Sequence, residues 1–227
     1  MTRDDVFERD SVLDRRAFAL QAAFRALLDA TARPGEAVEL PRADGPCAAD
    51  AAEAGLYPST VEVADVLLDA ATTFAVAGCA GEGALPARVT SRRTHALLAP
   101  LDEAPYVLLP EAVRADGAAR AIAALTPGTL LDPHLGATCL VECSALVGTG
   151  RDRARVGSVS GDVPTSRWRL TGPGIKESAV VECDRADVLL ARAGRADEFP
   201  CGIDLVLVSR AGHVVAIPRT TRIEEVA

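Results

Sequence analysis

The sequence has little lysine and few aromatic residues, and it lacks any excess of positive charge. Lys176 is the single lysine, so nearly all of the basic residues are arginines, and the aromatic fraction is 4%. The formal net charge of −8 argues against general binding to nucleic acids or to anionic membranes. Arginine suits bidentate contacts with phosphate or carboxylate groups better than lysine does, so individual anion sites stay open.

Long apolar runs are also absent. The start of the chain shows no basic segment followed by an apolar stretch, and no apolar run approaches the roughly 18 residues that a membrane-spanning helix needs. We therefore expect a soluble, cytoplasmic protein with no membrane partner. At 227 residues the chain can bury a substantial core. A single α/β domain over residues 1–227 is the leading interpretation, with two small domains as the alternative.

The cysteine pattern indicates neither a metal site nor a disulfide framework. The six cysteines form no C-x-x-C motif, and none lies beside a histidine at metal-ligand spacing. Cys139 and Cys143 are four residues apart in a predicted strand, so both should point to one face. In a cytoplasmic protein we expect them to be small buried hydrophobic residues, and we predict no metal ligands.

Common catalytic signatures are missing as well. There is no G-x-x-x-x-G-K-[ST] motif for nucleotide phosphates, and in residues 157–161 the serines flank the position that a nucleophile elbow requires. Lys176 is the only side-chain amine that pyridoxal phosphate could use, and it follows a Gly-Pro-Gly turn whose amides could meet a phosphate. No recognisable partner for the pyridinium nitrogen accompanies it. A pyridoxal enzyme is therefore a remote alternative, and we expect no cofactor.

Two apolar runs near the C-terminus predict a β-hairpin. Leu205–Val208 and a second run ending at Ile217 flank the turn residues 209–212. The first run has no polar alternation, so we expect it to be covered on both faces, as in a sheet with helices on either side. Pro218 lacks a backbone donor and should end the second strand.

Polar residues directly after this hairpin are the first candidates for a site. Arg219, Thr220 and Thr221 would project from the end of the second strand, and a charged fork beside two hydroxyls suits anion binding or a protein contact. The stretch Gly172-Pro173-Gly174 implies unusual backbone angles or close approach by another chain. A tight turn between strands is the alternative explanation for these glycines.

Elsewhere, helical spacing of apolar residues alternates with short apolar strands, which favours a three-layer α/β/α fold with a mixed β-sheet. Residues 1–13 are expected to be flexible, 41–58 to be a loop with or without one helical turn, and 148–166 to be a mobile loop or a β-ribbon. The helices are predicted at 14–32, 59–70, 84–95, 114–125 and 184–193, with Ser59–Glu62 as a capping box and Asp184 as the cap of the last. The further strands are predicted at 38–40, 72–76, 106–109, 137–142, 167–170 and 180–181.

Short motifs punctuate nearly the whole chain. They are Phe24-Arg25, Ala32-Arg33-Pro34-Gly35, Leu67-Leu68-Asp69, Thr73-Phe74, Gly128-Thr129-Leu130, Pro133, Gly136-Ala137-Thr138, Leu170-Thr171-Gly172-Pro173-Gly174-Ile175, Phe199-Pro200, Gly202-Ile203-Asp204 and Ile217-Pro218-Arg219-Thr220-Thr221. Each is weak by itself. In this order, however, they make the chain resemble the PhnH family, the H subunit of the bacterial carbon–phosphorus lyase system for phosphonate use.

The resemblance implies a fold similar to that of the pyridoxal-phosphate (PLP)-dependent transferases but without PLP. It also implies a homodimer that joins the G, I and J subunits in the carbon–phosphorus lyase core complex. This complex is needed for organophosphonate catabolism, in which ATP and an alkylphosphonate give ribose 1-alkylphosphonate 5-triphosphate. Autonomous catalysis is not expected, because the family has no assigned catalytic residues, and a structural or assembly role is the leading hypothesis.

The alternative is a catalytic subunit that binds phosphate or phosphonate through Arg219 or Arg33. The candidate ligand or subunit contacts are Arg33, Gly172, Gly174, Asp204, Arg219, Thr220 and Thr221. One departure from the family is the polar segment 148–166, which is longer than the usual connection.

Overall fold

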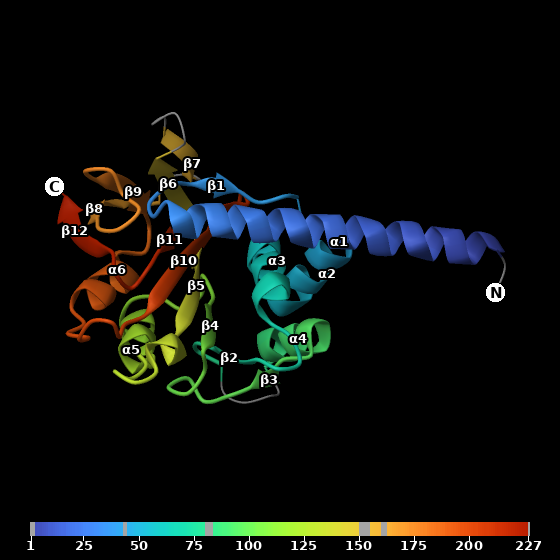
Figure 1. Cartoon of the computed structure of the whole chain (residues 1–227), viewed down its shortest axis with the longest axis horizontal. Helices are drawn as coiled ribbons and strands as arrows, with labels where there is room; N and C mark the ends of the chain where they lie inside the picture. The colour runs from blue at the N-terminus through green and yellow to red at the C-terminus, as the bar shows by residue number, and fades with distance from the viewer. Residues whose placement is uncertain (1–2, 43–44, 80–83, 150–154, 160–162, 227) are drawn as a thin grey trace.

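The computed structural model describes residues 3–42, 45–79, 84–149, 155–159 and 163–226 of the chain. Within these ranges the chain forms a large mixed sheet, a smaller second sheet and several helices (Figure 1). The helices are α1 (Arg3–Ala32), α2 (Gly45–Ala54), α3 (Pro58–Leu67), α4 (Leu85–Thr94), α5 (Asp116–Ala124), the 3₁₀ turn η1 (Pro133–Leu135) and α6 (Ala186–Ala193). The strands are β1 (Val38–Glu39), β2 (Thr73–Val76), β3 (Leu97–Leu98), β4 (Tyr106–Leu109), β5 (Thr138–Cys143), β6 (Ala145–Thr149), β7 (Arg155–Val159), β8 (Ser166–Thr171), β9 (Ala179–Cys183), β10 (Asp204–Ser209), β11 (His213–Ile217) and β12 (Arg222–Val226).

The larger sheet has seven strands in the order β1-β11-β10-β5-β4-β2-β3. The strands from β10 to β3 run parallel, whereas β11 is antiparallel to both of its neighbours. β10 and β11 form the predicted hairpin, with Leu205 opposite Ile217 and Val208 opposite Val214. The prediction of a mixed sheet is confirmed, because this hairpin adds an antiparallel partner to a parallel set.

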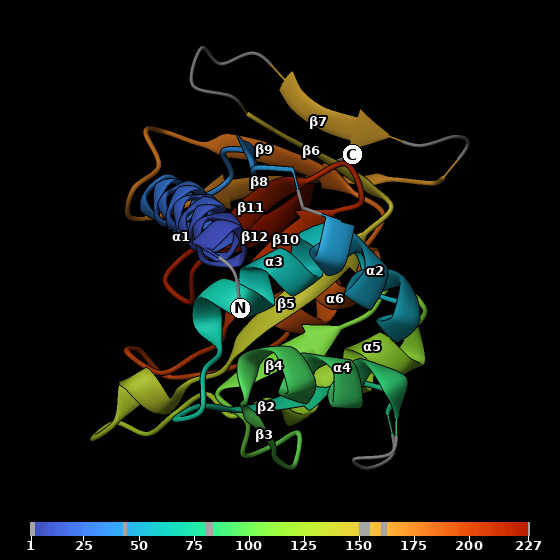
Figure 2. The same cartoon turned by 90° about the vertical axis from the view of Figure 1, so that its right-hand side faces the viewer.

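The uninterrupted apolar run of β10 is explained by burial on both faces. Leu205 and Leu207 belong to one hydrophobic cluster, and Val206 and Val208 belong to another. The first cluster contains buried residues of α5, α6 and the second sheet, and the second contains buried residues of α1, α2, α3 and α4. Figures 1 and 2 show the seven-stranded sheet between these two sets of elements.

The predicted strands at 167–170 and 180–181 are present as β8 and β9, but the sequence does not predict that they form a second, separate sheet. Its five strands are antiparallel and have the order β12-β8-β9-β6-β7. β6 ends in the polar segment 148–166, and β7, with which it pairs, lies within that segment. Residues 150–154 and 160–162 of the segment lie outside the described ranges. β12 pairs with β8 and places Ile223 opposite Leu170, and both side chains join the first hydrophobic cluster. The terminal residues after the hairpin are therefore a strand of a different sheet.

Two helices correct the predicted boundaries. α1 begins at Arg3 and not at Asp14, and its N-terminal part extends away from the sheets (Figure 1). Residues 3–32 contain no glycine or proline that would interrupt a helix, so the regular backbone continues beyond the apolar pattern. α2 occupies a segment predicted to be a loop, because its alanine-rich sequence favours a helix and its cysteine packs into the core. The expected flexibility of residues 1–13 stays a prediction.

The predicted helix caps are wrong at α3 and α6. The N-cap residue of α3 is Tyr57, and the Ser59 hydroxyl instead donates to the carbonyl of Ser209 at 2.8 Å. The N-cap residue of α6 is Arg185, and the Asp184 carboxylate accepts backbone N–H groups at the start of β6. In both places the side chain that local capping rules assign to the helix forms its hydrogen bond with a segment that is far away in the sequence.

Candidate functional site

Two of the predicted site residues meet where β10 begins and β11 ends. Asp204 is the first residue of β10, and Arg219 lies just beyond β11. Arg219 Nη2 donates to Asp204 Oδ2 at 2.5 Å, and the Arg219 backbone N–H donates to Oδ1 at 2.6 Å. This ion pair ties together the two ends of the hairpin that lie opposite its turn.

The same guanidinium also holds the loop that precedes β5. Arg219 donates to the backbone carbonyls of Pro133 and of Gly136, the latter at 3.3 Å. A Cβ on Gly136 would lie 2.6 Å from Arg219 Nη1, and a Cβ on Gly202 would lie 3.0 Å from Arg219 Cβ. The guanidinium is therefore directed onto its own chain rather than projecting from the strand end. Its part in a ligand or subunit contact stays a prediction.

Gly172 and Gly174 sit between the segment after β11 and the end of α1. Gly172 has φ 143°, and a Cβ there would lie 3.0 Å from the Thr220 carbonyl oxygen and 3.3 Å from Thr221 Cα. Gly174 has φ 80°, and its Cβ would lie 2.8 Å from the Ala32 carbonyl oxygen. Both glycines thus have the unusual backbone angles that the sequence predicts. Thr220 is exposed, whereas Thr221 is buried and its hydroxyl has no hydrogen-bond partner among the described residues.

Arg33 forms a separate group of charges at the end of α1. Its Nη2 lies 3.2 Å from Asp29 Oδ1, and its Nε lies 2.8 Å from Glu36 Oε2. Two carboxylates thus offset its charge, which weakens its attraction for a phosphate. The structure brings together Asp204 with Arg219, Gly172 with Thr220 and Thr221, and Gly174 with the residues next to Arg33.

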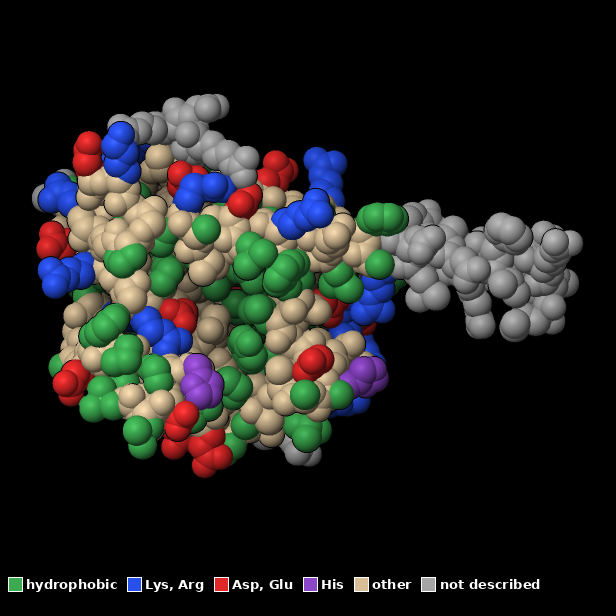
Figure 3. All heavy atoms as spheres, viewed as in Figure 1, with side chains coloured by type: hydrophobic (Ala, Val, Ile, Leu, Met, Phe, Trp, Pro, Cys, Tyr) green, Lys and Arg blue, Asp and Glu red, His purple; other side chains and the backbone are tan. Residues whose placement is uncertain are grey.

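Large hydrophobic side chains are exposed on the two loops next to the Arg219 ion pair. A backbone hydrogen bond of 2.8 Å from Gly202 to Pro127 joins these loops, and Figure 3 shows hydrophobic side chains gathered over this part of the molecule, beside α5 and α6. Exposed apolar residues that are grouped in this way mark protein interaction sites. We call the four residues the loop surface: Leu130, Leu131, Leu135 and Phe199, with exposed fractions of 61, 92, 50 and 76%.

A polar cluster at the opposite end of the parallel strands is not predicted by the sequence analysis. Glu111 follows β4, Ser144 follows β5 and Arg210 follows β10. The Tyr57 hydroxyl and Arg210 Nη2 donate to Glu111 Oε2 at 2.5 and 2.8 Å, and the Ser144 hydroxyl donates to Oε1. Arg114 Nη2 lies 3.4 Å from the same Oε1. The available signal was a polar residue within two positions of the end of each of three buried parallel strands, because open α/β sheets bind ligands at the carboxyl ends of their strands.

The protonation behaviour of this cluster does not suit acid–base catalysis. Desolvation raises the pKa of Glu111, but hydrogen bonds from Ser144, Tyr57 and Arg210 outweigh it and lower this pKa to about 2. Desolvation and the hydrogen bond to Glu111 raise the pKa of Tyr57. A carboxylate with so low a pKa is a poor base for activating the Ser144 hydroxyl. The arrangement is better suited to holding negative charge than to moving protons.

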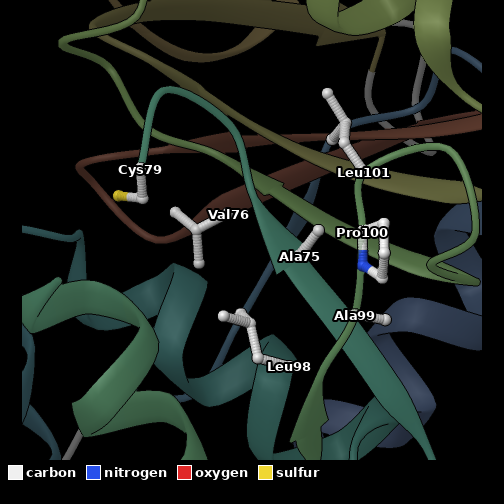
Figure 4. A pocket seen from close by; sticks show the side chains of 7 residues that line it. All are labelled: Ala75, Val76, Cys79, Leu98, Ala99, Pro100 and Leu101. Carbon is white, nitrogen blue, oxygen red and sulfur yellow. The ribbon is translucent and has the colours of Figure 1, made fainter. Parts of the chain in front are cut away.

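Two hollows among the described residues have mainly apolar walls. A cavity of 340 Å³ beside β2, at the end of β3 and the residues after it, is lined by apolar side chains and the Cys79 thiol, whose pKa is raised by burial (Figure 4). A groove of 220 Å³ between α1 and the sheet has Asp204 at its side and mainly apolar walls. Among the described residues no cluster of His, Cys, Asp or Glu side chains could hold a metal ion. The described helices include none that is long and apolar enough to cross a membrane.

Comparison with protein families finds one match that spans most of the chain. The family model is described as bacterial phosphonate metabolism protein (PhnH), and it matches residues 12–224. The matched range runs from within α1 to within β12 and includes all of the predicted site residues. No curated protein sequence matches the chain. The family resemblance that the motifs indicate is confirmed.

Proposed function

Because the chain belongs to the PhnH family of bacterial phosphonate metabolism proteins, we propose that it is a subunit of the carbon–phosphorus lyase core complex and acts there by protein contact rather than by catalysis. It would form a homodimer in the cytoplasm and join the G, I and J subunits. The complex would convert ATP and an alkylphosphonate to ribose 1-alkylphosphonate 5-triphosphate. The fold would resemble that of PLP-dependent transferases, but the protein would not bind the cofactor. The exposed position of Lys176 supports the expected absence of PLP.

The observation that carries the proposal is the loop surface. Leu131 is 92% exposed and Phe199 is 76% exposed, and large apolar side chains gain free energy when a partner covers them. The ion pair of Arg219 with Asp204 and its bonds to two backbone carbonyls fix the loop that carries Leu131. A contact surface on a fixed loop loses less conformational entropy on binding than one on a mobile loop.

Co-expression with the G, I and J subunits tests the proposal. The double variant Leu131→Ser, Phe199→Ser should fold but should lose copurification with the other subunits. Leu97→Ser is the matched control, because Leu97 is 66% exposed but belongs to β3 at the far edge of the sheet. If the double variant copurifies as well as the wild type does, the loop surface is not the contact.

The alternative function, a catalytic subunit that binds phosphate or phosphonate through Arg219 or Arg33, has less support. Both guanidinium groups are paired with carboxylates of the chain itself. Calorimetry of the isolated protein with ATP, adenine and methylphosphonate separates the two functions. Binding that Arg219→Ala or Arg33→Ala abolishes would favour the alternative.

A further inference from the structure

The polar cluster at Glu111 has the form of an anion-binding hole with an occupant from the chain itself. Four donors from four separate segments point at one carboxylate: Tyr57 before α3, Arg114 before α5, Ser144 between β5 and β6, and Arg210 in the hairpin turn. Arg210 also stacks on the Tyr57 ring, with 4.9 Å between its guanidinium carbon and the ring centroid. A single surface ion pair needs no such convergence.

A buried carboxylate beneath the hole fixes the backbone on two of its sides. Glu142 is 1% exposed, and its two oxygens accept the backbone N–H groups of Tyr57 at 2.6 Å and of Glu111 at 2.9 Å. Burial raises the pKa of Glu142, so placing this group here is costly to the fold. A costly group that positions two residues of the cluster is typical of a preorganised binding site.

The hole opens to solvent at the carboxyl ends of the parallel strands, which is where open α/β sheets bind ligands. The Arg210 side chain is 65% exposed, Arg114 is 35% exposed and Glu111 is 29% exposed. Glu111 lies in the loop after β4, so its side chain can swing outward without a change in the sheet. We propose that a small oxyanion group, as in phosphate, phosphonates or carboxylates, displaces the Glu111 carboxylate and binds to these four donors.

Charges around the hole are compatible with an added anion. Asp184 is 1% exposed and is held by Arg114 Nη1 at 2.8 Å and by backbone N–H groups. Asp187 is paired with Arg185 at 3.2 Å and accepts a backbone N–H. These two carboxylates, and Glu142 beneath the hole, already have donors of their own, so the group that competes with a ligand for the hole is Glu111. The site is distinct from the loop surface and does not rest on the assembly role.

Removing the charge of Glu111 should therefore strengthen anion binding. The Glu111→Gln protein should bind inorganic phosphate at least tenfold more tightly than the wild type in isothermal titration calorimetry. Glu182→Gln is the matched control: Glu182 also accepts bonds from a hydroxyl and an arginine, those of Thr165 and Arg155, but it lies in the second sheet. This control should bind phosphate as the wild type does.

Further variants and probes keep the test decisive. Adding Arg210→Ala to Glu111→Gln should abolish the gain, because Arg210 is an exposed donor whose loss leaves the fold intact. If Glu111→Gln does not fold, Glu111→Ala, which empties the hole, replaces it. Methylphosphonate and acetate in place of phosphate show which oxyanion class the hole prefers. An affinity for phosphate, methylphosphonate and acetate that is the same in Glu111→Gln, in Glu182→Gln and in the wild type overturns the proposal, whatever the outcome of copurification.

Discussion

Replacing Arg219 by alanine should destabilise the protein without unfolding it. The change removes a guanidinium that is bound to Asp204 and to the carbonyls of Pro133 and Gly136. The backbone N–H of residue 219 would still reach Asp204, so the carboxylate would keep one of its donors. The two carbonyls would lose their partner and would depend on water that enters the gap.

The expected cost follows from the burial of the pair. Breaking a fully buried ion pair costs about 3–5 kcal/mol, and exposed pairs contribute about 0–1 kcal/mol. The side chains of Arg219 and Asp204 are 18% and 28% exposed, so the pair lies between these limits. We expect a loss of about 2–4 kcal/mol, which is less than the roughly 5–15 kcal/mol of stability of a typical domain. Urea unfolding should show a lower midpoint at an unchanged slope, with a shift of roughly 1 M.

A double-mutant cycle separates the ion pair from nonspecific effects. Arg219→Ala, Asp204→Ala and the double variant should give a coupling free energy of about 1–3 kcal/mol. Arg155→Ala is the matched control, because Arg155 is paired with Glu182 but is 66% exposed, and its loss should cost less than about 1 kcal/mol. Equal urea midpoints for Arg219→Ala and Arg155→Ala would refute the structural role of Arg219. A folded Arg219→Ala protein can then be used to test assembly.

Three further predictions rest on other parts of the fold. Because the folded pKa of Glu111 is lowered to about 2 from 4.5, its contribution to stability should be present above pH 4.5 and should be lost as the pH falls towards 2. The free energies of unfolding of wild type and Glu111→Gln should differ by about 1–2 kcal/mol after solvent screening, and urea unfolding at decreasing pH should show this difference shrinking over that range. Gly172→Ala should lower the free energy of unfolding by about 1–2 kcal/mol more than Gly212→Ala does, because both glycines have positive φ but only at Gly172 would the Cβ meet backbone atoms. Equal losses would contradict the packing of the Gly172 turn against Thr220. Burial raises the pKa values of Cys139 and Cys183 to about 12, so both should resist a thiol reagent in the native protein, while the partly exposed Cys201 should react. Labelling of all three thiols at the same rate would contradict the burial of Cys139 and Cys183.

Most strands of the large sheet were predictable because they are short runs of apolar residues that are buried on both faces, whereas the two-residue edge strand β3 was not predicted. β4 and β10 have no polar interruption, and this pattern alone indicates a strand between two covering layers. The second sheet gave a weaker signal, since β8 buries only alternate residues such as Trp168 and Leu170, and its partner β12 lies far away in the sequence. α2 was predicted to be a loop because it begins with glycine and proline and contains an aspartate, residues that are typical of turns.

The candidate site was predictable in part, because glycine constrains the backbone whereas arginine adapts to its surroundings. Gly172 and Gly174 have the backbone angles that their sequence context implies. No local pattern tells whether an arginine such as Arg219 faces solvent or a carboxylate, since Asp204 meets it only when β10 and β11 pair. Glu111 shows the same limit, because its four donors come from segments that only the folded sheet brings together.

The arginines at the two ends of β10 are therefore bonded in different ways. At the end where β10 begins, Arg219 is bonded to the Asp204 carboxylate and to two backbone carbonyls, and these carbonyls cannot leave without loosening a loop. At the edge where β10 ends, Arg210 is bonded to a carboxylate on a side chain that can swing away. A ligand can replace a mobile side chain but not a backbone carbonyl that the fold itself fixes. An oxyanion should thus compete at Arg210 and not at Arg219, and any phosphate binding by this chain should be lost in Arg210→Ala and kept in Arg219→Ala.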